Sequence, residues 1–421
     1  MNIPKTKYPR IVIIGGGFGG LKLALSINSK IAQIVLLDKN SYHTFQPLMY
    51  QVATAGLEAD SIAYPIRKVF RNKDNFFFRL AQVQRIDVSS KMVFTDIGQL
   101  EYDYLVIATG AVTNYFGNAD LEENCIPMKS LTEALNIRSH ILQNLEKALN
   151  STDENEREAL LNIVIVGGGP TGVELAGAIA ELRKYILAKD YPDLNVTRMK
   201  IHIVEGSPRI LNAMSDQSSI EGEKALLKMG IILHLNTHVK SYDGLNLDAG
   251  SLQLKTYTLI WAAGVKGAPV DGLPPDTIVG NRILVNEYNQ VNGQTNVFAI
   301  GDVALQKTNA FPKGFPMLGS IAQQQGQVLG KNLNLLLSNK KMLPFVYKDR
   351  GTMATIGRNA AVVDLKFWKF SGLFAWIVWM FIHLMLLVSF RNRVVVFINW
   401  VWSYFSYDKG TRLIIPKFKK K

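Results

Sequence analysis

Two glycine-rich motifs of the same kind are the residues of this chain that point most directly to chemistry. The spacing G-x-G-x-x-G occurs twice, at Gly15, Gly17 and Gly20 and again at Gly167, Gly169 and Gly172. In this spacing the first glycine permits a tight turn, the second lets the backbone approach a pyrophosphate, and the third lets a helix pack close to a strand. The N-terminus of that helix presents free N–H groups to the phosphates. Two such motifs, each following an apolar strand, predict two dinucleotide sites.

A carboxylate follows each motif at the end of the next apolar run. Asp38 lies 18 residues after the last glycine of the first motif, and Glu205 lies 33 residues after that of the second, where we interpret Lys189–Arg198 as an insertion. An acid about 20 residues past the motif hydrogen-bonds the ribose hydroxyls. Because an acid also repels a 2′-phosphate, Glu205 predicts NADH rather than NADPH, a preference that the nearby Arg209 weakens. The alternative is that both residues are ordinary strand-end acids.

The elements that must position these motifs alternate between strands and helices. Tyr104–Gly110 and Thr258–Gly264 are buried-strand patterns with similar endings, Ala-Thr-Gly and Ala-Ala-Gly, which indicates an internal duplication. We therefore predict an α/β fold with two Rossmann-like dinucleotide-binding domains. Apolar periodicity predicts helices at Leu131–Asn150 and Ser320–Leu337, and Phe76–Val83 is expected to open a set of antiparallel strands.

Length and cysteine content narrow the class of protein. A chain of 421 residues has room for two or three domains. The one cysteine, Cys125, excludes a disulfide framework and fits a reducing compartment. Met1–Arg10 is too short for a targeting sequence. The histidines form no metal-ligand pattern, so no metal is predicted.

The positive charge gathers at the C-terminal end of the chain. Residues 346–421 contain 13 Lys and Arg against three acids, which gives +10 of the net +13, together with five of the six tryptophans. The aromatic residues lie inside apolar runs rather than among the lysines, so we expect anionic lipid as the partner and no nucleic acid. The chain closes with four lysines, Lys417, Lys419, Lys420 and Lys421.

Two apolar segments of this region predict membrane contact. Phe370–Phe390 has no Lys, Arg, Asp or Glu and is long enough to span a bilayer, but basic residues flank both of its ends, contrary to the usual charge bias. Val394–Tyr407 places Asn399, Ser403 and Ser406 on one helical face, which is typical of an interfacial helix. We favour two amphipathic helices lying in the membrane surface over a true span. A buried dimer interface is a further alternative.

The motifs together resemble the two-dinucleotide-binding-domain flavoprotein superfamily that includes the disulfide reductases. The resemblance rests on both glycine motifs, the two Ala-x-Gly strand endings and the Ala-Ile-Gly-Asp segment that ends at Asp302. It implies that the first motif binds FAD and that the second, inserted within the FAD domain, binds NAD(P)H. Disulfide reductases of this superfamily need a C-x4-C pair beside the flavin, which a chain with Cys125 alone does not have. Thiol chemistry is therefore excluded.

Five segments are similar to the type II NADH dehydrogenases, the non-pumping NADH:quinone oxidoreductases. They are Tyr42–Ala53, Gly172–Glu174, Ala322–Gln327 with its A-Q-x-x-x-Q pattern, Thr355–Ala360 and Trp400–Tyr407. The resemblance covers essentially the whole chain. It implies FAD-dependent oxidation of NADH in a respiratory chain, hydride transfer through the flavin, and two-electron reduction of a membrane quinone, ubiquinone or menaquinone, without proton pumping.

The same resemblance assigns the cofactor residues to two groups. The group expected at FAD is Gly15, Gly17, Phe18, Gly20, Asp38, Lys39, Gln51, Ala108, Thr109, Gly110, Gly301, Asp302 and Gln323. The group expected at NADH is Gly167, Gly169, Thr171, Gly172, Glu174, Glu205, Ala263 and Gly264. For Asp302 the alternative is a helix N-cap.

Three residues are expected to be catalytic. Gln323 and Gln327 lie four positions apart on one helical face and are expected to orient the quinone carbonyls or the pyrimidine edge of the flavin. Glu174 is expected to touch the nicotinamide or to help protonate the quinone. The plain alternatives are glutamines on a helix surface and an acid that complements the dipole at a helix start.

These assignments predict four segments along the chain. Residues 1–115 and 271–345 form the FAD-binding domain, residues 116–270 the NADH-binding domain, and residues 346–421 a C-terminal amphipathic helical membrane-anchoring region. We expect a peripheral homodimer on the cytoplasmic face of the bacterial inner membrane. The alternative functions are a membrane-associated redox sensor that binds FAD and NADH, or an oxygen-reducing NADH oxidase; a ferredoxin or rubredoxin reductase is a further rival.

Overall fold

The computed structural model of the chain describes residues 1–407 and 410–414. The chain divides into two compact units, each built from three separate stretches. Unit 1 consists of Met1–Thr44, Ala63–Val112 and Val265–Lys348. Unit 2 consists of Phe45–Ile62, Thr113–Gly264 and Asp349–Lys421. Unit 2 thus combines most of the predicted NADH-binding segment with the C-terminal region, and it includes a stretch that the sequence assigns to the FAD-binding domain.

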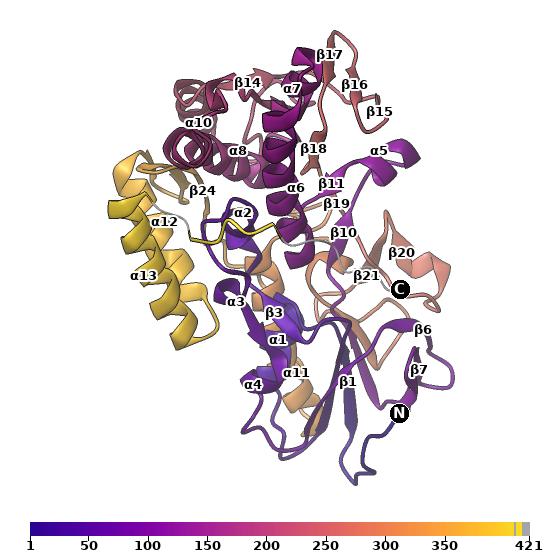
Figure 1. The fold of residues 1–421 in the computed structure, drawn as a ribbon. Helices are drawn as coiled ribbons and strands as arrows, with labels where there is room; N and C mark the ends of the chain where they lie inside the picture. Colours follow the sequence, from indigo (N-terminus) through magenta and orange to yellow (C-terminus); the bar gives the residue numbers. More distant parts are fainter. Residues whose placement is uncertain (408–409, 415–421) are drawn as a thin grey trace. The chain divides into compact units, whose positions relative to one another are not determined.

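A five-stranded parallel sheet forms the centre of unit 1 (Figure 1). In spatial order its strands are β22 (Val297–Ala299), β9 (Tyr104–Ile107), β1 (Arg10–Ile14), β2 (Gln33–Asp38) and β5 (Phe76–Leu80). Because β5 pairs in parallel with β2, the prediction that Phe76 opens an antiparallel set is wrong. An aromatic and apolar run does not encode its partner strand, which the topology of the whole sheet decides.

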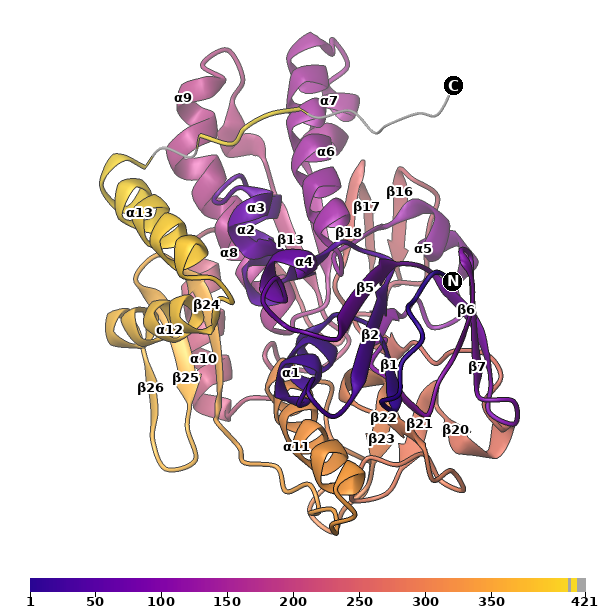
Figure 2. The same ribbon diagram turned by 90° about the horizontal axis from the view of Figure 1, so that it is seen from below.

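The two faces of this sheet bury alternate residues of β1. Ile11 and Ile13 pack against α1 (Phe18–Ser26) and α11 (Gly319–Leu337), which lie side by side in Figures 1 and 2. Val12 and Ile14 pack on the other face against an antiparallel sheet of β6 (Val83–Asp87), β7 (Met92–Thr95) and β8 (Gly98–Glu101). Other elements of unit 1 are β3 (Tyr42–Thr44), β4 (Ala63–Pro65), α4 (Ile66–Val69), β19 (Val265–Gly267), β20 (Ile278–Val279), β21 (Arg282–Val285), η5 (Gly301–Val303) and β23 (Ala304–Gln306).

Unit 2 repeats the same plan around the second glycine motif. Its parallel five-stranded sheet has the order β11 (Ile126–Pro127), β18 (Thr258–Trp261), β12 (Ile163–Val166), β13 (Ile201–Val204) and β14 (Ile231–His234). Its longer helices are α6 (Leu131–Asn150), α7 (Glu154–Leu161), α8 (Pro170–Leu182) and α10 (Asp216–Lys228). The bounds of α6 are those predicted, because Ser130 and Glu133 form a capping box at its start.

Shorter elements of unit 2 surround this sheet. They are η1 (Gln46–Leu48), α2 (Met49–Ala53), α3 (Ala59–Ile62), α5 (Ala119–Asn124), the π-helix η2 (Arg183–Leu187), α9 (Ala188–Asp190), η3 (Val196–Arg198), β15 (Ser241–Tyr242), β16 (Asn246–Ala249) and β17 (Leu252–Lys255). In the long gap between the second motif and Glu205, η2 and α9 continue α8 directly, and η3 follows after a turn before the chain enters β13.

The C-terminal region of unit 2 contains a small antiparallel sheet followed by two helices (Figures 1 and 2). The strands are β24 (Thr352–Gly357), β25 (Ala360–Asp364) and β26 (Lys369–Ser371), and the helices are α12 (Leu373–Leu386) and α13 (Phe390–Ser406). The apolar run Phe370–Phe390 is therefore not one helix. In the described part of the chain, no helix has the length and apolar character needed to cross a membrane. The four closing lysines lie outside the described residues.

Candidate active site

The first glycine motif forms the turn between β1 and α1 in unit 1. Gly15 has φ of +105°, and a Cβ there would lie 2.3 Å from the carbonyl oxygen of Ala108. A Cβ on Gly20 would lie 1.9 Å from the carbonyl oxygen of Gly15. The Cβ position of Gly17, in contrast, has no atom of the described residues within 4 Å. Two glycines thus hold the turn against the sheet, and the third leaves open space of the kind that a pyrophosphate occupies.

Polar groups around this turn fit a dinucleotide such as FAD. None of the described side chains caps α1, whose N-cap residue is Gly17, so its first N–H groups are available to phosphates. The Gly16 N–H donates to Asp38 Oδ2 at 2.5 Å, and the Asn40 N–H donates to Oδ1 at 2.6 Å. Burial raises the pKa of Asp38 above its ordinary value, and these two hydrogen bonds oppose that rise. Asp38 therefore lies against the turn, where a ribose-binding acid is expected.

The remaining residues predicted for FAD lie in unit 1, with one exception. Phe18 meets His43 edge to face with ring centroids 5.2 Å apart, and His43 Nδ1 lies 3.0 Å from the carbonyl oxygen of Gly16. Thr109 Oγ1 donates to the carbonyl oxygen of Ala268 at 2.6 Å, and Lys39 is exposed. The exception is Gln51, which belongs to unit 2.

Asp302 lies in the 3-10 helix η5, whose cap residue is Ile300, so its interpretation as an N-cap is wrong. The turn before Asp302 is held by a residue that sequence reasoning missed. The Gly301 N–H donates to Gln325 Oε1 at 2.8 Å, and Gln325 Nε2 donates to Gln306 Oε1 at 3.3 Å. Gln325 is buried on α11. The sequence did contain a signal for Gln325, because it lies four residues after Ile321 on an apolar helical face. A polar side chain buried on such a face needs a hydrogen-bond partner.

The three residues predicted to be catalytic fall into different units. Gln323 and Gln327 lie on α11 of unit 1, where Gln323 is half-buried and Gln327 is exposed. Glu174 belongs to unit 2. It follows Pro170 by four residues, so it lies beyond the first turn of α8, and the interpretation of Glu174 as an acid at a helix start is wrong.

The second glycine motif has the same geometry in unit 2. Gly167 has φ of +112°, and a Cβ there would lie 2.7 Å from the carbonyl oxygen of Ala262. A Cβ on Gly172 would lie 1.9 Å from the carbonyl oxygen of Gly167, whereas that of Gly169 would have no described atom within 4 Å. Thr171 is exposed, Ala263 is half-buried, and Gly264, three residues after the end of β18, has φ of +148°.

Glu205 takes the place at this turn that Asp38 takes in unit 1. The Gly168 N–H donates to Glu205 Oε2 at 2.5 Å, and the Ser207 N–H donates to Oε1 at 2.7 Å. Arg209 forms an ion pair with Asp216, and its Nε donates to Asn212 Oδ1 at 3.1 Å. The guanidinium of Arg209, which weakened the prediction of NADH over NADPH, is therefore already bound to Asp216 and Asn212.

The thiol of Cys125 is unsuited to redox chemistry. It is buried, and burial raises its pKa to about 12. A thiol with such a pKa carries almost no thiolate near neutral pH, and the thiolate is the reactive form. The exclusion of thiol chemistry made from the cysteine count is consistent with this environment.

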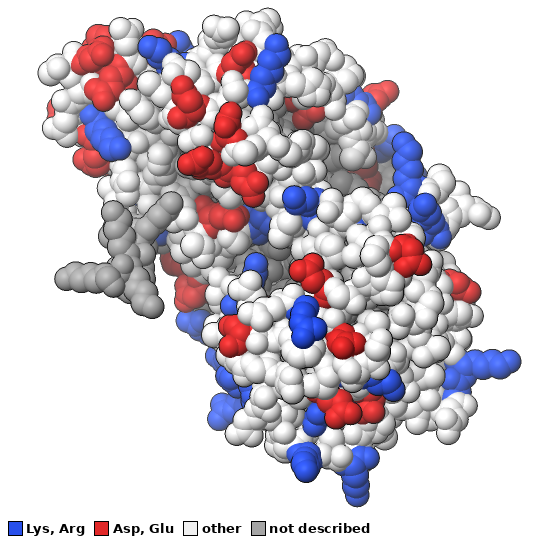
Figure 3. Space-filling model, turned by 90° about the vertical axis from the view of Figure 1, so that its right-hand side faces the viewer, with Lys and Arg blue, Asp and Glu red and all other residues white. Residues whose placement is uncertain are grey.

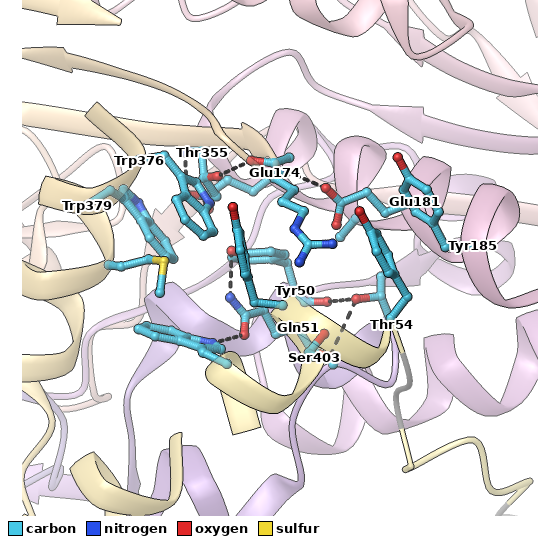
Figure 4. Close-up of a pocket in the computed structure, with 18 of the residues that line it drawn as sticks. Tyr50, Gln51, Thr54, Glu174, Glu181, Tyr185, Thr355, Trp376, Trp379 and Ser403 are labelled. Atoms are coloured by element: carbon cyan, nitrogen blue, oxygen red, sulfur yellow. Dashed lines mark hydrogen bonds between the residues drawn. The ribbon is translucent and has the colours of Figure 1, made fainter. Parts of the chain in front are cut away.

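An aromatic pocket with a volume of about 120 Å³ lies entirely within unit 2 (Figure 4). Three stretches that are far apart in the sequence supply its walls: α2 and the residues after it, α8 with its π-helical extension, and the C-terminal region with β24, α12 and α13. Its lining includes Tyr50, Gln51, Glu174, Glu181, Tyr185, Thr355, Arg358, Trp376, Trp379, Trp400, Tyr404 and Tyr407. We call it the aromatic pocket.

Glu174 is the buried acid of the aromatic pocket. Its side chain reaches toward Thr355 in Figure 4, whose N–H lies 3.4 Å from Glu174 Oε1. Burial raises the pKa of Glu174 to about 8, and this hydrogen bond opposes the rise. Glu174 is therefore mostly protonated at neutral pH and can supply a proton to a molecule in the pocket.

A hydrogen-bonded chain crosses the floor of the aromatic pocket. Trp400 Nε1 donates to Gln51 Oε1 at 2.8 Å, and Gln51 Nε2 donates to the Tyr50 hydroxyl at 2.8 Å. Tyr50 is buried, and its ring centroid lies 6.3 Å from that of Trp379. Sequence reasoning missed Tyr50, Trp379 and Trp400 as site residues, although the segments that contain Tyr50 and Trp400 carried the family resemblance.

The polar side of α13 faces its own unit, and its apolar side is exposed. Asn392 Nδ2 donates to the carbonyl oxygens of Asp60 and Ser61 at 3.0 and 2.9 Å, and Asn399 Nδ2 donates to Glu58 Oε2 at 2.8 Å. The exposed apolar side chains of α12 and α13, which we call the apolar strip, are Leu373, Phe374, Ile377, Phe381, Met385, Leu386, Phe390, Val394, Phe397, Ile398, Val401, Trp402 and Phe405. In the view of Figure 3, by contrast, the surface mixes cationic and acidic side chains.

Two family models match the chain. The model described as pyridine nucleotide-disulphide oxidoreductase matches residues 9–326, and the model described as the NDH2 C-terminal domain matches residues 350–406. The second match therefore covers the region that supplies β24, α12 and α13 to the aromatic pocket.

Named relatives and solved structures extend this similarity over most of the chain. The type II NADH:quinone oxidoreductase NdhA of Mycobacterium tuberculosis is 33% identical over 428 residues, with 96% of this chain and 89% of the relative covered. The type II NADH:quinone oxidoreductase of Staphylococcus aureus is 27% identical, with 84% and 89% covered. The fold is that of NDH2 from Plasmodium falciparum solved with NADH, with a TM-score of 0.90, 23% identity and 97% and 100% covered. The sulfide:quinone oxidoreductase of Aquifex aeolicus has a TM-score of 0.68 at 19% identity, with 94% and 95% covered.

Proposed function

Because the chain belongs to the family of type II NADH:quinone oxidoreductases, we propose that its two glycine turns hold FAD and NADH and that its aromatic pocket receives the quinone. The chain is thus an FAD-dependent enzyme that oxidises NADH and reduces a quinone without pumping protons. The observation that carries the assignment of the pocket is Glu174, a protonatable acid buried among aromatic side chains. A quinone head group is a flat apolar ring with two carbonyl oxygens, and it needs both kinds of neighbour.

FAD, when bound, accepts hydride from NADH and passes two electrons to the quinone. The chain supplies the groups that would hold FAD. The open space at Gly17 and the uncapped start of α1 suit the pyrophosphate, and Asp38 suits the ribose hydroxyls. The turn at Gly301, held by Gln325, lets the backbone beside Asp302 approach the cofactor.

NADH is the nucleotide that the second turn favours over NADPH. Glu205 lies against the turn, where it suits the ribose hydroxyls and repels a 2′-phosphate. Arg209, the cation near enough in sequence to bind that phosphate, is paired with Asp216. Selection of NADH therefore rests on one acid that acts directly and one ion pair that removes a competing cation.

Glu174 supplies a proton to the quinone. Reduction of a quinone to its quinol consumes two electrons and two protons, and the hydride of NADH brings both electrons and one proton. A neutral Glu174 holds the other proton, which bulk water cannot deliver directly to a buried carbonyl oxygen. After each turnover the acid takes up a proton from solvent.

The apolar strip binds the membrane surface from which the quinone comes. A helix pair with exposed Phe, Trp, Leu and Ile side chains is stabilised when these side chains enter the lipid interface. Arg391 and Arg393 lie at the start of α13, between Phe390 and Val394 of the strip, and attract anionic headgroups. We place the protein at the cytoplasmic face of the bacterial inner membrane, as a member of a respiratory chain. We also propose a homodimer, on the family resemblance, and light scattering in detergent checks it.

Steady-state turnover with a water-soluble quinone tests this function against its rivals. We expect NADH oxidation in the absence of oxygen at about 1–1000 per second, the usual range of enzymes, and dependent on added quinone. A rate near one per minute would leave a redox sensor as the function. A rate that depends on oxygen and not on quinone would leave an NADH oxidase.

A further inference from the structure

The hydrogen-bonded chain in the aromatic pocket has a fixed direction. An indole N–H is a donor and never an acceptor, so the atom of Gln51 that faces Trp400 must be its carbonyl oxygen, Oε1. The amide nitrogen, Nε2, then faces Tyr50 and donates to its hydroxyl oxygen. Trp400 thus fixes the orientation of the Gln51 amide group. Gln51 in turn makes the hydroxyl oxygen of Tyr50 a hydrogen-bond acceptor.

With this direction, the hydrogen of the Tyr50 hydroxyl has no hydrogen-bond acceptor among the described residues. Among the residues that the structure describes, Gln51 is the one hydrogen-bond partner of this hydroxyl, and it acts as the donor. Tyr50 has 6% of its surface exposed and lines the aromatic pocket, so solvent does not readily take the hydrogen. A buried hydroxyl that must donate and has no acceptor needs one from a bound molecule.

A quinone carbonyl is the acceptor that this arrangement suits. Its oxygen accepts hydrogen bonds and has no hydrogen to donate, so it is complementary to a hydroxyl whose acceptor side is already taken by Gln51. The walls near Tyr50 include Trp376 and Trp379, apolar aromatic side chains of the kind that suit a quinone ring (Figure 4). Burial, followed by the charge of Glu174, keeps the pKa of Tyr50 well above its ordinary value, so the hydroxyl stays protonated.

We propose that Tyr50 donates a hydrogen bond to one carbonyl oxygen of the quinone, and that Gln51 and Trp400 are positioning residues that fix the direction of its hydroxyl. This inference rests on the proposed function, because it takes the aromatic pocket as the quinone site. Tyr50 orients the quinone and withdraws electron density from its carbonyl, and it does not release its proton. Gln51, which the sequence assigned to FAD, acts here through Tyr50.

The first test is Tyr50→Phe, which removes the hydroxyl and keeps the ring. We expect kcat/KM for a soluble quinone to fall about tenfold, the scale of one buried hydrogen bond, and the rate of flavin reduction by NADH to stay unchanged. Tyr242→Phe is the matched control, because it removes another buried tyrosine hydroxyl of unit 2, one that donates to the carbonyl oxygen of Thr256 at 3.0 Å outside the pocket. Equal quinone kinetics in wild type and Tyr50→Phe would overturn the proposal.

The second test is Gln51→Glu, which reverses the chain without removing the hydroxyl. A carboxylate at this position accepts hydrogen bonds from both Trp400 and Tyr50, so the tyrosine hydrogen turns away from the pocket. We expect the same loss as in Tyr50→Phe, and no further loss when the two changes are combined. A Gln51→Glu protein with normal FAD content and wild-type quinone kinetics would refute the fixed direction.

A vibrational measurement separates the hydrogen bond from any change in packing. The infrared difference spectrum is recorded with a soluble quinone 13C-labelled at its carbonyls. We expect one carbonyl band at lowered frequency in wild type and Tyr242→Phe, and its return toward the frequency in apolar solvent in Tyr50→Phe. An unshifted band in wild type would contradict the donor role. If the wild-type protein does not turn over quinone at all, the proposed function fails, whereas turnover that is insensitive to Tyr50 and Gln51 sinks this inference alone.

Discussion

The two glycine turns and the aromatic pocket, the proposed sites for the dinucleotides and the quinone, are built in different ways. Each turn is made by a run of six residues, and its shape is set mainly by contacts between backbone atoms. A Cβ at Gly20 or Gly172 would lie 1.9 Å from a carbonyl oxygen of its own turn. The pocket, in contrast, is made by side chains from segments as distant as Tyr50, Glu174, Thr355 and Trp400. A backbone site therefore carries a local signature, whereas a side-chain site exists only in the folded unit.

This difference predicts that the two kinds of site fail differently when mutated. A turn tolerates no side chain at its closest contact, so one added methyl group should remove both binding and local packing. The pocket offers polar groups that can be exchanged for isosteric ones, so its chemistry should be lost while its fold remains. Of the four changes below, the first two test this contrast and the other two test the apolar strip and the ion pair of Arg209; they run from the largest expected effect to the smallest.

Gly172→Ala should have the largest effect. The new methyl group overlaps the carbonyl oxygen of Gly167, so α8 must move, and a displacement of about 1 Å costs on the order of 100-fold in rate. We expect NADH oxidation to fall by more than about 100-fold and the melting temperature to fall. Gly169→Ala is the matched variant: its methyl group meets open space, so we expect lost NADH binding at an unchanged melting temperature. Normal turnover by Gly172→Ala would contradict the assignment of this turn.

Glu174→Gln should lower quinone reduction by about 100-fold at neutral pH, the scale of general acid catalysis. The pKa of Glu174 is raised to about 8, so the active protonated form predominates below that pH and is lost as the pH rises through it. We therefore expect the wild-type kcat to fall above about pH 8 and this fall to be absent from the variant. The measurement is kcat against pH with a soluble quinone.

Glu181→Gln is the control for this pH dependence, because Glu181 is another acid of the same pocket and accepts a hydrogen bond from the Arg358 N–H. It should keep the fall above pH 8. Loss of the fall in this control but not in Glu174→Gln would move the proton donor to Glu181.

Phe405→Asn should weaken binding to anionic vesicles about 30-fold. Its ring is 79% exposed on α13, and burying such a side chain in lipid is worth about 2 kcal/mol. Leu25→Asn changes an exposed apolar side chain of α1 in unit 1 and should bind vesicles like wild type. Vesicle flotation measures both. Equal loss in the two variants would mean that the apolar strip has no special role.

Asp216→Asn should have the smallest effect, a shift of about fivefold in kcat/KM toward NADPH. The change breaks the ion pair with Arg209 and frees a cation for the 2′-phosphate, and an exposed ion pair is worth at most about 1 kcal/mol. The ratio of kcat/KM for NADPH to that for NADH is the measurement. An unchanged ratio would show that Glu205 alone selects NADH.

The same contrast explains what the sequence could predict. Both turns, their acids and the helix Leu131–Asn150 follow from spacing and capping, which are local properties. Burial of Glu174 depends on β24 and α12, more than 170 residues away in the sequence, so its raised pKa could not be foreseen. The pairing of Phe76–Leu80 with β2 was mispredicted for the same reason, because strand order is a property of the whole sheet.

Rapid mixing under anaerobic conditions tests the central claim most directly, because it separates the two sites in time. Wild-type protein is mixed first with NADH and then with a soluble quinone, while the flavin absorption is followed. The account predicts bleaching and then recovery in wild type, no bleaching in Gly172→Ala, and normal bleaching with recovery about 100-fold slower in Glu174→Gln. Bleaching without quinone-driven recovery in wild type would contradict it.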